Sequence, residues 1–116
     1  MHELSLCQSI GAIASRHAGG RRVAVIHVRV GQLRQIVPET LVYCWDLVSA
    51  STVLEGARLE VERVPARIRC RDCSADALLG DLPVFACAAC HSTSVEITAG
   101  EEFLITSLDL TEEALP

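Results

Sequence analysis

The hydrophobic residues of the chain are spaced in two ways, and these spacings predict a helix followed by a strand in its first part. Residues 3–18 have apolar side chains three or four positions apart, which is typical of an amphipathic helix. The predicted apolar stripe comprises Leu6, Ile10, Ile13 and His17, with Cys7 and Ala14 beside it. Residues 21–30 alternate instead and are rich in β-branched residues, so we expect a strand with Ala24, Ile26, Val28 and Val30 on one face.

The same two spacings recur after residue 37. Pro38 and Glu39 suit the first turn of a second helix, because proline there lacks only an N–H that would have no partner and an acid interacts favourably with the helix dipole. This helix is expected to end between residues 49 and 52. Residues 57–64 and 102–110 alternate as further strands, with a short strand around 95–98. Two helices on one face of a three-stranded sheet would form an α+β layer.

Two short pairs of cysteines lie between these strands, in Cys70-Arg71-Asp72-Cys73 and Cys87-Ala88-Ala89-Cys90. Each pair brings two thiolates together on a tight turn, and two such turns facing each other form a tetrahedral set of sulfur ligands. Zinc accepts soft thiolates in this geometry, and four thiolates leave no open position, which indicates a structural site. We therefore expect structural Zn²⁺ bound by Cys70, Cys73, Cys87 and Cys90.

The cysteine-containing segment is expected to form a lobe of its own. It is too short to bury much apolar surface, so the metal should supply most of its folding free energy. We predict a discontinuous α/β domain of residues 1–64 and 99–116 and a zinc-binding domain of residues 65–98. The predicted fold class is α+β: two helices packed on a three-stranded sheet, with an inserted zinc-ribbon-like lobe of four cysteines.

Composition and charge narrow the function mainly by exclusion. The formal net charge is −5, and all ten basic residues are arginine. An acidic chain without a basic stripe is a poor partner for a phosphate backbone, so we expect no nucleic-acid binding. We find no membrane-spanning segment and no secretory signal, and six cysteines without such a signal indicate reduced thiols, so we expect a cytoplasmic protein that does not bind a membrane.

The first three residues form a second candidate metal site. The α-amine of Met1 and the amide nitrogen and imidazole of His2 can form two fused chelate rings, and Glu3 adds an amide or a carboxylate. A nitrogen-rich, square-planar set of this kind suits Ni(II) or Cu(II) better than zinc. The ligands must be deprotonated, so affinity should fall on acidification. A histidine at this position is also common in chain ends without a function, so the three residues alone leave both interpretations open.

Several short motifs, in this order along the chain, resemble those of the HypA family of nickel metallochaperones. They are Met1-His2-Glu3-Leu4-Ser5, Val28-Arg29-Val30-Gly31, Val37-Pro38-Glu39, Gly56-Ala57-Arg58-Leu59-Glu60, Val64-Pro65-Ala66 and the two cysteine pairs. The resemblance implies that Met1, His2 and Glu3 bind Ni²⁺ as a transported ion, apart from the structural zinc. It further implies delivery of nickel, together with a maturation GTPase of the same pathway, to the large-subunit precursor of a [NiFe]-hydrogenase.

Other interpretations of the cysteine pairs predict different properties. The segment Cys87-Ala88-Ala89-Cys90-His91 matches a c-type haem attachment motif, but that chemistry goes with export and leaves the first pair without a role. A rubredoxin-like iron site would make the protein coloured and redox-active. The main alternative function is a zinc-stabilised module that binds protein or nucleic acid without nickel transfer. No acid–base or nucleophile constellation is recognisable in the sequence, so we expect no enzyme activity.

The remaining cysteines and histidines have less specific surroundings. Cys7 and Cys44 fall at apolar helical positions, so we expect small core residues there. We expect His17 and His27 to be packed or hydrogen-bonded, and His91, which follows the second pair where a small residue is usual, to support the site or face solvent. Nickel held by one chain and nickel shared between two copies both agree with the sequence, so a homodimer stays open.

Overall fold

The computed structural model describes residues 2–80 and 84–115, with the side chain of His2 outside the description. The elements in chain order are α1 (His2–His17), β1 (Arg21–Gly31), η1 (Gln32–Arg34), α2 (Pro38–Ser49), β2 (Arg58–Val64), β3 (Arg67–Cys70), β4 (Asp76–Leu78), β5 (Val95–Ala99) and β6 (Phe103–Ala114). The chain forms two compact units. The first comprises residues 1–29, 36–62 and 104–116, and the second comprises residues 30–35 and 63–103.

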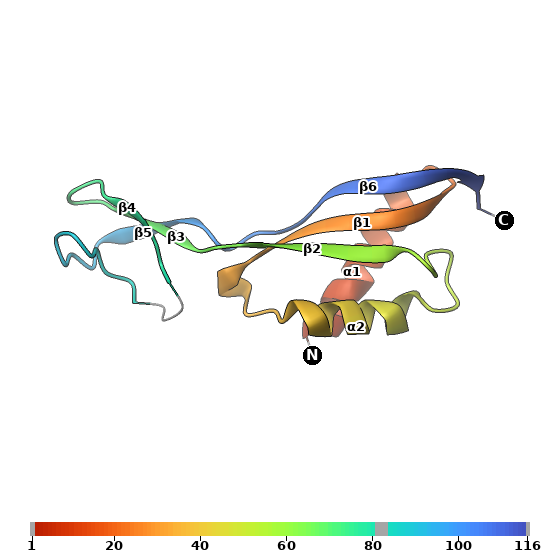
Figure 1. Ribbon diagram of the computed structural model, residues 1–116, viewed down its shortest axis with the longest axis horizontal. Coiled ribbons are helices and arrows are strands. Elements are labelled where there is room, and N and C mark those ends of the chain that lie inside the picture. The colour runs from red at the N-terminus through yellow and green to blue at the C-terminus, as the bar shows by residue number, and fades with distance from the viewer. Residues whose placement is uncertain (1, 81–83, 116) are drawn as a thin grey trace. The chain divides into compact units, whose positions relative to one another are not determined.

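The first unit is a layer of helices on a sheet. Its three strands lie in the order β2-β1-β6, and both helices lie on one side of the sheet (Figure 1). The capping signals in the sequence account for the helix ends: Gly19 follows α1 with a φ of 62°, and Pro38 stands at the start of α2. The predicted α+β fold is therefore confirmed. None of the described helices is long and apolar enough to cross a bilayer.

The core of this unit lies between the helices and the sheet. Its fully buried residues include Cys7, Ile10, Ile26, Val28, Leu41 and Trp45. Trp45 is also fixed by a hydrogen bond, because its indole Nε1 donates to the carbonyl oxygen of Ala57 at 2.9 Å. An aromatic residue with both its ring buried and its N–H satisfied is a strong packing anchor. It holds α2 against the segment that leads into β2.

The buried stripe of α1 is rotated from the predicted one. Ala14 and Ala18 are buried with Cys7 and Ile10, whereas Ile13 is 38% exposed and His17 lies on the surface. Small side chains allow a helix to approach its neighbours closely, so the face that carries two alanines and a cysteine turns inward. The expectation that His17 packs in the core was therefore wrong.

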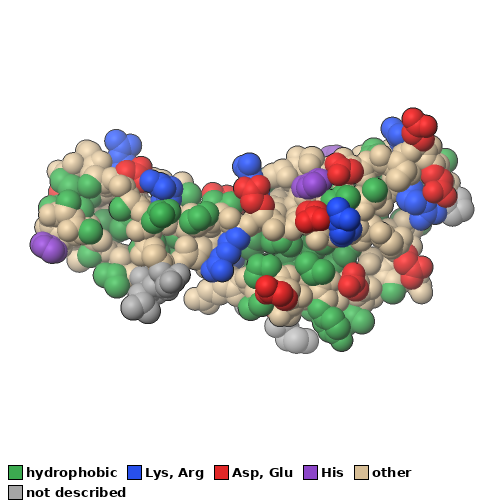
Figure 2. Space-filling view, viewed as in Figure 1, with side chains coloured by type: hydrophobic (Ala, Val, Ile, Leu, Met, Phe, Trp, Pro, Cys, Tyr) green, Lys and Arg blue, Asp and Glu red, His purple; other side chains and the backbone are tan. Residues whose placement is uncertain are grey.

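The outer face of the first sheet is covered by charged side chains of both signs. Arg22 pairs with Glu113 at 3.2 Å, and Arg29 pairs with Glu62 at 3.4 Å. The space-filling view shows arginine and acidic side chains interspersed, with no large patch of one sign on the visible face (Figure 2). Exposed pairs of this kind contribute little to stability. Their alternation gives no continuous basic track for a phosphate backbone.

The second unit contains a sheet that the sequence had not revealed. Its strands lie in the order β4-β3-β5, and both pairings are antiparallel. Ile68 lies opposite Ala77 in β4 and opposite Ile97 in β5, and it belongs to a small buried cluster with Ala66 and Leu79. The signal for β3 was the alternation of arginine with apolar residues in Arg67-Ile68-Arg69-Cys70. It is only four residues long, too short to identify a strand by itself.

Two glycines allow the backbone segments of this unit to approach one another. A Cβ placed on Gly31 would lie 2.1 Å from the carbonyl oxygen of Gly100, and a Cβ on Gly100 would lie 2.6 Å from the Cα of Ala66. Gly100 also has a φ of 111°, which side chains rarely allow. The side chain of Gln32 adds to this junction, because its Nε2 donates to the Gly80 carbonyl at 2.7 Å and its Oε1 accepts from the Ala66 N–H at 2.9 Å.

The predicted domain boundaries stay a prediction. Residues 63–103 form one compact unit together with 30–35, so the segment predicted as a zinc-binding domain, 65–98, lies within it. Compactness in the folded chain does not show that a segment folds independently.

Candidate metal centre

The four cysteines of the two pairs lie together in the second unit. Their sulfur atoms are all within 4.8 Å of one another. The shortest separations join the two pairs: 3.6 Å between Sγ of Cys70 and Sγ of Cys90, and 3.6 Å between Sγ of Cys73 and Sγ of Cys87. A zinc tetrahedron with Zn–S bonds of about 2.3 Å has its sulfur atoms about 3.8 Å apart. The sulfur positions therefore fit a tetrahedral zinc ion, with each of the four thiolates as one ligand.

Both pairs form the same local turn. In the first, the N–H of Cys73 points at Sγ of Cys70 at 3.5 Å, and the N–H of Ser74 donates to the Cys70 carbonyl at 3.0 Å. In the second, the N–H of Cys90 points at Sγ of Cys87 at 3.4 Å, and His91 donates to the Cys87 carbonyl at 2.8 Å. We call these turns the first knuckle (70–74) and the second knuckle (87–91). The spacing of two residues between cysteines produces this arrangement because it places a backbone N–H over the first sulfur.

The residue that closes each knuckle has a left-handed backbone conformation. The φ angle is 64° at Ser74 and 62° at His91. A side chain at such a φ is uncommon and costs about 1–3 kcal/mol. This explains why a small residue is usual at these positions. His91 is exposed, as expected, and its backbone N–H rather than its imidazole supports the knuckle.

The first cysteine of each pair is stabilised as a thiolate by the backbone. Cys70 and Cys87 are buried, at 2% and 6% exposure. The N–H of Cys73 is the main cause that lowers the pKa of Cys70, and the N–H of Cys90, followed by that of Ala89, lowers the pKa of Cys87 to about 7. Metal binding requires deprotonated thiols, so the lowered pKa values of these two residues favour binding of a cation.

The second cysteine of each pair is exposed and holds its proton more strongly. For Cys73 the Ala75 N–H acts to lower the pKa, but the thiol across the cage and burial outweigh it, so the pKa is raised. For Cys90 the Ser92 N–H acts in the same lowering direction, and the neighbouring thiols and burial raise the pKa to about 12. Four thiols this close cannot all ionise without a cation between them, which is the charge balance that Zn²⁺ supplies.

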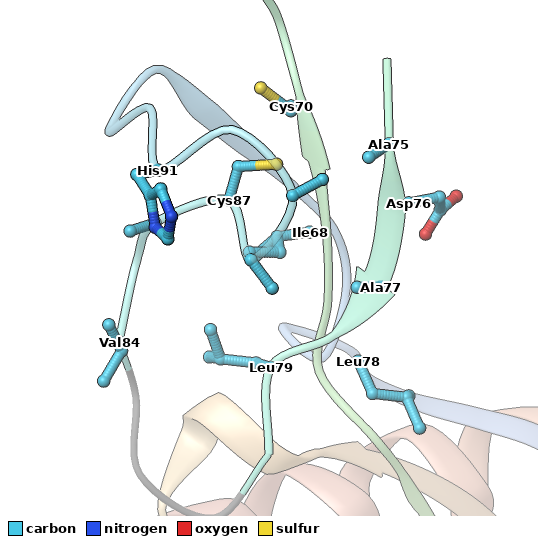
Figure 3. Close-up of a pocket in the computed structure, with 13 residues that line it drawn as sticks. Ile68, Cys70, Ala75, Asp76, Ala77, Leu78, Leu79, Val84, Cys87 and His91 are labelled. Atoms are coloured by element: carbon cyan, nitrogen blue, oxygen red, sulfur yellow. The ribbon is translucent and has the colours of Figure 1, made fainter. Parts of the chain in front are cut away.

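An apolar cavity of ≈ 480 Å³ lies beside the knuckles. Ile68, Leu79 and Val84 line it together with the buried ligands Cys70 and Cys87 (Figure 3). The first cysteine of each pair is thus buried beside apolar side chains, while Cys73 and Cys90 are exposed.

Of the predicted nickel ligands, the structure describes Glu3 and the backbone of His2. Met1 is outside the described residues, and so is the side chain of His2, whose backbone begins α1. Glu3 is partly buried in the first turn of α1, and its carboxylate contributes to raising the pKa of Cys7. The nickel ligand set therefore stays a prediction. Its central residue, His2, is the first residue of α1.

Cys7 lies in the core and His27 is hydrogen-bonded, as expected, whereas Cys44 is not the core residue that the sequence predicted. The thiol of Cys7 is fully buried and donates to the Leu41 carbonyl at 3.4 Å. Cys44 is partly buried on α2. The Nε2 of His27 lies 3.0 Å from Oδ2 of Asp109. Within residues 2–80 and 84–115, the four knuckle cysteines are the one group of three or more such donors close enough to share an ion.

Comparison with known proteins identifies the family. A family model described as "Hydrogenase/urease nickel incorporation, metallochaperone, hypA" matches residues 1–110. The chain belongs to the HypA family. The match includes the chain end, the predicted nickel site, and both knuckles, so the resemblance seen in the sequence is confirmed.

Named HypA relatives match along almost their whole length. The hydrogenase maturation factor HypA of Geotalea uraniireducens (strain Rf4) is 39% identical over 110 residues, which cover 95% of this chain and 99% of the relative. That of Roseiflexus sp. (strain RS-1) is 38% identical over 116 residues, covering 97% of this chain and 94% of the relative. Hydrogenase maturation is the process that these relatives' names state.

Two solved HypA structures share the fold. A solution structure of a HypA protein aligns with a TM-score of 0.72 and 26% identity, covering 97% of this chain and 98% of its own. The solution structure of the Ni metallochaperone HypA from Helicobacter pylori aligns with a TM-score of 0.65 and 26% identity, covering 97% of each chain. The α+β fold with an inserted four-cysteine lobe is thus the fold of the HypA family, and its four-cysteine site is able to hold zinc.

Proposed function

We propose that this HypA-family chain binds Ni(II) through Met1, His2 and Glu3 and delivers it during maturation of a [NiFe]-hydrogenase. The observation that carries the proposal is the family match over residues 1–110, which begins at the predicted nickel ligands. The start of α1 at His2 supports it, because the helix fixes the backbone of the two residues after Met1. The nickel ion is cargo here, and ligands at a chain end suit a cargo that must leave again.

The ligand chemistry determines how nickel would be held and released. Where Met1 is the mature N-terminus, its amine, the His2 amide nitrogen and the His2 imidazole supply nitrogen donors for a square-planar Ni(II) ion. Each donor must lose or lack a proton, so acid or a competing acceptor ligand frees the ion stepwise. Transfer then occurs by ligand exchange: each nickel–donor bond is replaced by one to the acceptor, and the His2 amide nitrogen regains its proton as the ion leaves.

The second unit would serve as a zinc-stabilised scaffold. Cys70, Cys73, Cys87 and Cys90 would hold Zn²⁺, and four thiolates leave the ion no position for a substrate or water. For this reason we assign no catalytic activity to the protein. We expect a maturation GTPase and the hydrogenase large-subunit precursor as partners, in the cytoplasm, where thiols stay reduced.

Nickel calorimetry on zinc-loaded, untagged protein tests the proposal directly. We expect near-stoichiometric binding that disappears in His2→Ala. His17→Ala is the matched control, because His17 is an exposed histidine at the other end of the same helix, and this variant should bind nickel like the wild type. Equal binding by all three proteins, or none, contradicts the proposed site. Zinc content and helicity measured in parallel exclude loss of the fold.

Two further measurements define the ligand set and the acceptor. A Gly-Ser extension before Met1 removes the α-amine from the chelate while retaining His2 and Glu3, so it should weaken nickel binding strongly. The nickel-to-protein ratio, together with the mass of the complex, separates a site within one chain from one shared by two copies. In cells that produce only the His2→Ala variant, the nickel content of the hydrogenase large subunit should be low. If that content is normal and urease lacks nickel instead, urease is the acceptor.

A further inference from the structure

Ser92 lies outside both cysteine pairs, yet it is hydrogen-bonded to both knuckles. Its carbonyl oxygen accepts from the N–H of Cys87 at 2.8 Å, which fixes it to the second knuckle. Its hydroxyl Oγ donates to Oδ2 of Asp72, which lies between the two cysteines of the first knuckle. The hydroxyl also accepts from the N–H of Ser94 at 3.0 Å, so its proton is left to point at the carboxylate. We call the Ser92–Asp72 contact the bridge.

The bridge joins the two knuckles that hold the four thiols together. The short sulfur–sulfur contacts, Cys70 to Cys90 and Cys73 to Cys87, each join one knuckle to the other, so separating the knuckles would take ligands away from the ion. Cys73 and Cys90 are exposed, so a chelator can reach the site from their side. A bond to a carboxylate is stronger than one between neutral groups.

The first knuckle is also held to the segment that follows the second knuckle. The N–H of Arg71 donates to the Ser94 carbonyl at 2.9 Å, and its guanidinium Nη1 donates to the Val95 carbonyl at 2.9 Å. These contacts do not involve the side chains of Asp72 or Ser92. Removing either side chain therefore leaves the lobe with its β3–β5 pairing and its main-chain link, so the variants should fold.

We propose that Asp72 and Ser92 are positioning residues for the zinc site, which hold the knuckles at the separation that four zinc–sulfur bonds require and slow the release of the ion. The role rests on zinc being the ion held by the four thiols, as proposed above. Asp72 and Ser92 do not contact the metal in this arrangement. They act through the cysteines next to them, as residues beyond the ligand shell commonly do.

The rate of zinc release tests the bridge in the full-length protein. Zinc transfer to the chromophoric chelator 4-(2-pyridylazo)resorcinol should be about 10-fold faster, or more, in Asp72→Ala and in Ser92→Ala than in the wild type. The double variant should release zinc no faster than either single one, because each change removes the same contact. Ser92→Thr keeps the hydroxyl and should restore slow release. Asp76→Asn is the control, a carboxylate of the same lobe that pairs with Arg67 at 3.4 Å.

The Asn variant separates the hydrogen bond from the charge of the carboxylate. A zinc ion bound by four thiolates has a net charge of two negative units. If Asp72 acted only through its negative charge, removing that charge should slow zinc release. The bridge predicts the opposite: Asp72→Asn, whose amide oxygen still accepts from Ser92, should fall between wild type and Asp72→Ala. In the Co(II)-substituted protein, the visible bands of the tetrahedral thiolate site should weaken in the alanine variants and stay intense in Ser92→Thr.

Two results would overturn the role of the bridge. Release rates within twofold of wild type in both alanine variants would show that the bridge does not restrain the cage. Additive effects in the double variant would show that the two side chains act separately. If wild-type protein contains one zinc and one of these results is found, the bridge alone fails. If the wild type neither contains nor binds zinc, the zinc assignment fails together with it.

Discussion

The buried thiol of Cys7 gives a stability change with pH that can be worked out from the structure. Burial is the main cause that raises its pKa from the ordinary 9.0 to about 11, with smaller contributions from Cys44 and Glu3. The unfolded chain loses this proton above pH 9, whereas the folded chain keeps it until about pH 11. At about 1.4 kcal/mol for each pKa unit, the folded state loses about 2.7 kcal/mol across this window.

Comparison with Cys7→Ala isolates this contribution from those of other groups that ionise in the same window. The chain has no lysine, and its ten arginines stay protonated, but Tyr43 and the five other cysteines of the unfolded chain also lose protons there. Below pH 9 the thiol is neutral in both states and the contribution is intact. Above the folded-state pKa both states are ionised, and the burial of a thiolate opposes folding. The free energy of unfolding should therefore decline between pH 9 and pH 11 and change little from this cause below pH 8.

Urea unfolding at several pH values, followed by Trp45 fluorescence, measures this decline in the unit that contains Cys7. Trp45 reports on it because the indole is buried in the same core. In Cys7→Ala the decline should shrink by about 2–3 kcal/mol, even though the variant is less stable at pH 7. Cys44→Ala is the control and should keep most of the decline, because burial is the main cause at Cys7. Equal slopes in wild type and Cys7→Ala would refute the reasoning.

Three further predictions concern the backbone and the metal. Gly31→Ala should destabilise the protein by about 3 kcal/mol in urea unfolding, because its Cβ would lie 2.1 Å from the Gly100 carbonyl oxygen. Gly11→Ala is the control: its Cβ would lie 3.7 Å from Trp45, an ordinary contact, so the free energy of unfolding should not fall by a similar amount. His91→Gly should relieve the left-handed strain and stabilise the zinc lobe by about 1 kcal/mol, measured by its hydrogen exchange; a loss of stability would contradict this. Chelation of zinc should unfold residues 65–98 to proteolysis and leave the fluorescence of Trp45 unchanged; persistent protease resistance would show that the lobe folds without metal.

Those parts of the fold that depend on local spacing could be predicted from the sequence. The helices were identified from apolar residues three or four apart, and Pro38 marked the start of the second. The two knuckles could be predicted from the spacing within each cysteine pair, because two intervening residues place a backbone N–H over the first sulfur. The order of elements and the HypA resemblance were right for the same reason: both depend on residues that are close together in the sequence.

Features that depend on residues distant in the chain were missed. The β3–β4–β5 sheet pairs strands of three to five residues, whose patterns are too short to recognise. The face that α1 buries was rotated by packing, which favoured Ala14 and Ala18 over the larger Ile13. The bridge joins Asp72 to Ser92, 20 residues apart, and nothing near either residue signals the other.

The two metal sites differ in how far a sequence can specify them, and the difference is physical. The four thiols of the zinc site are held by turns that each pair builds for itself, so their geometry follows from spacing and the observed 3.6 Å contacts agree with it. The proposed nickel donors include an α-amine and a deprotonated amide, groups that every chain end possesses. The side chains of His2 and Glu3 distinguish this end from others, and the fold contributes the start of α1. A site that must release its ion benefits from ligands that the fold holds loosely, because ligands fixed as firmly as the knuckle cysteines would retain nickel rather than deliver it.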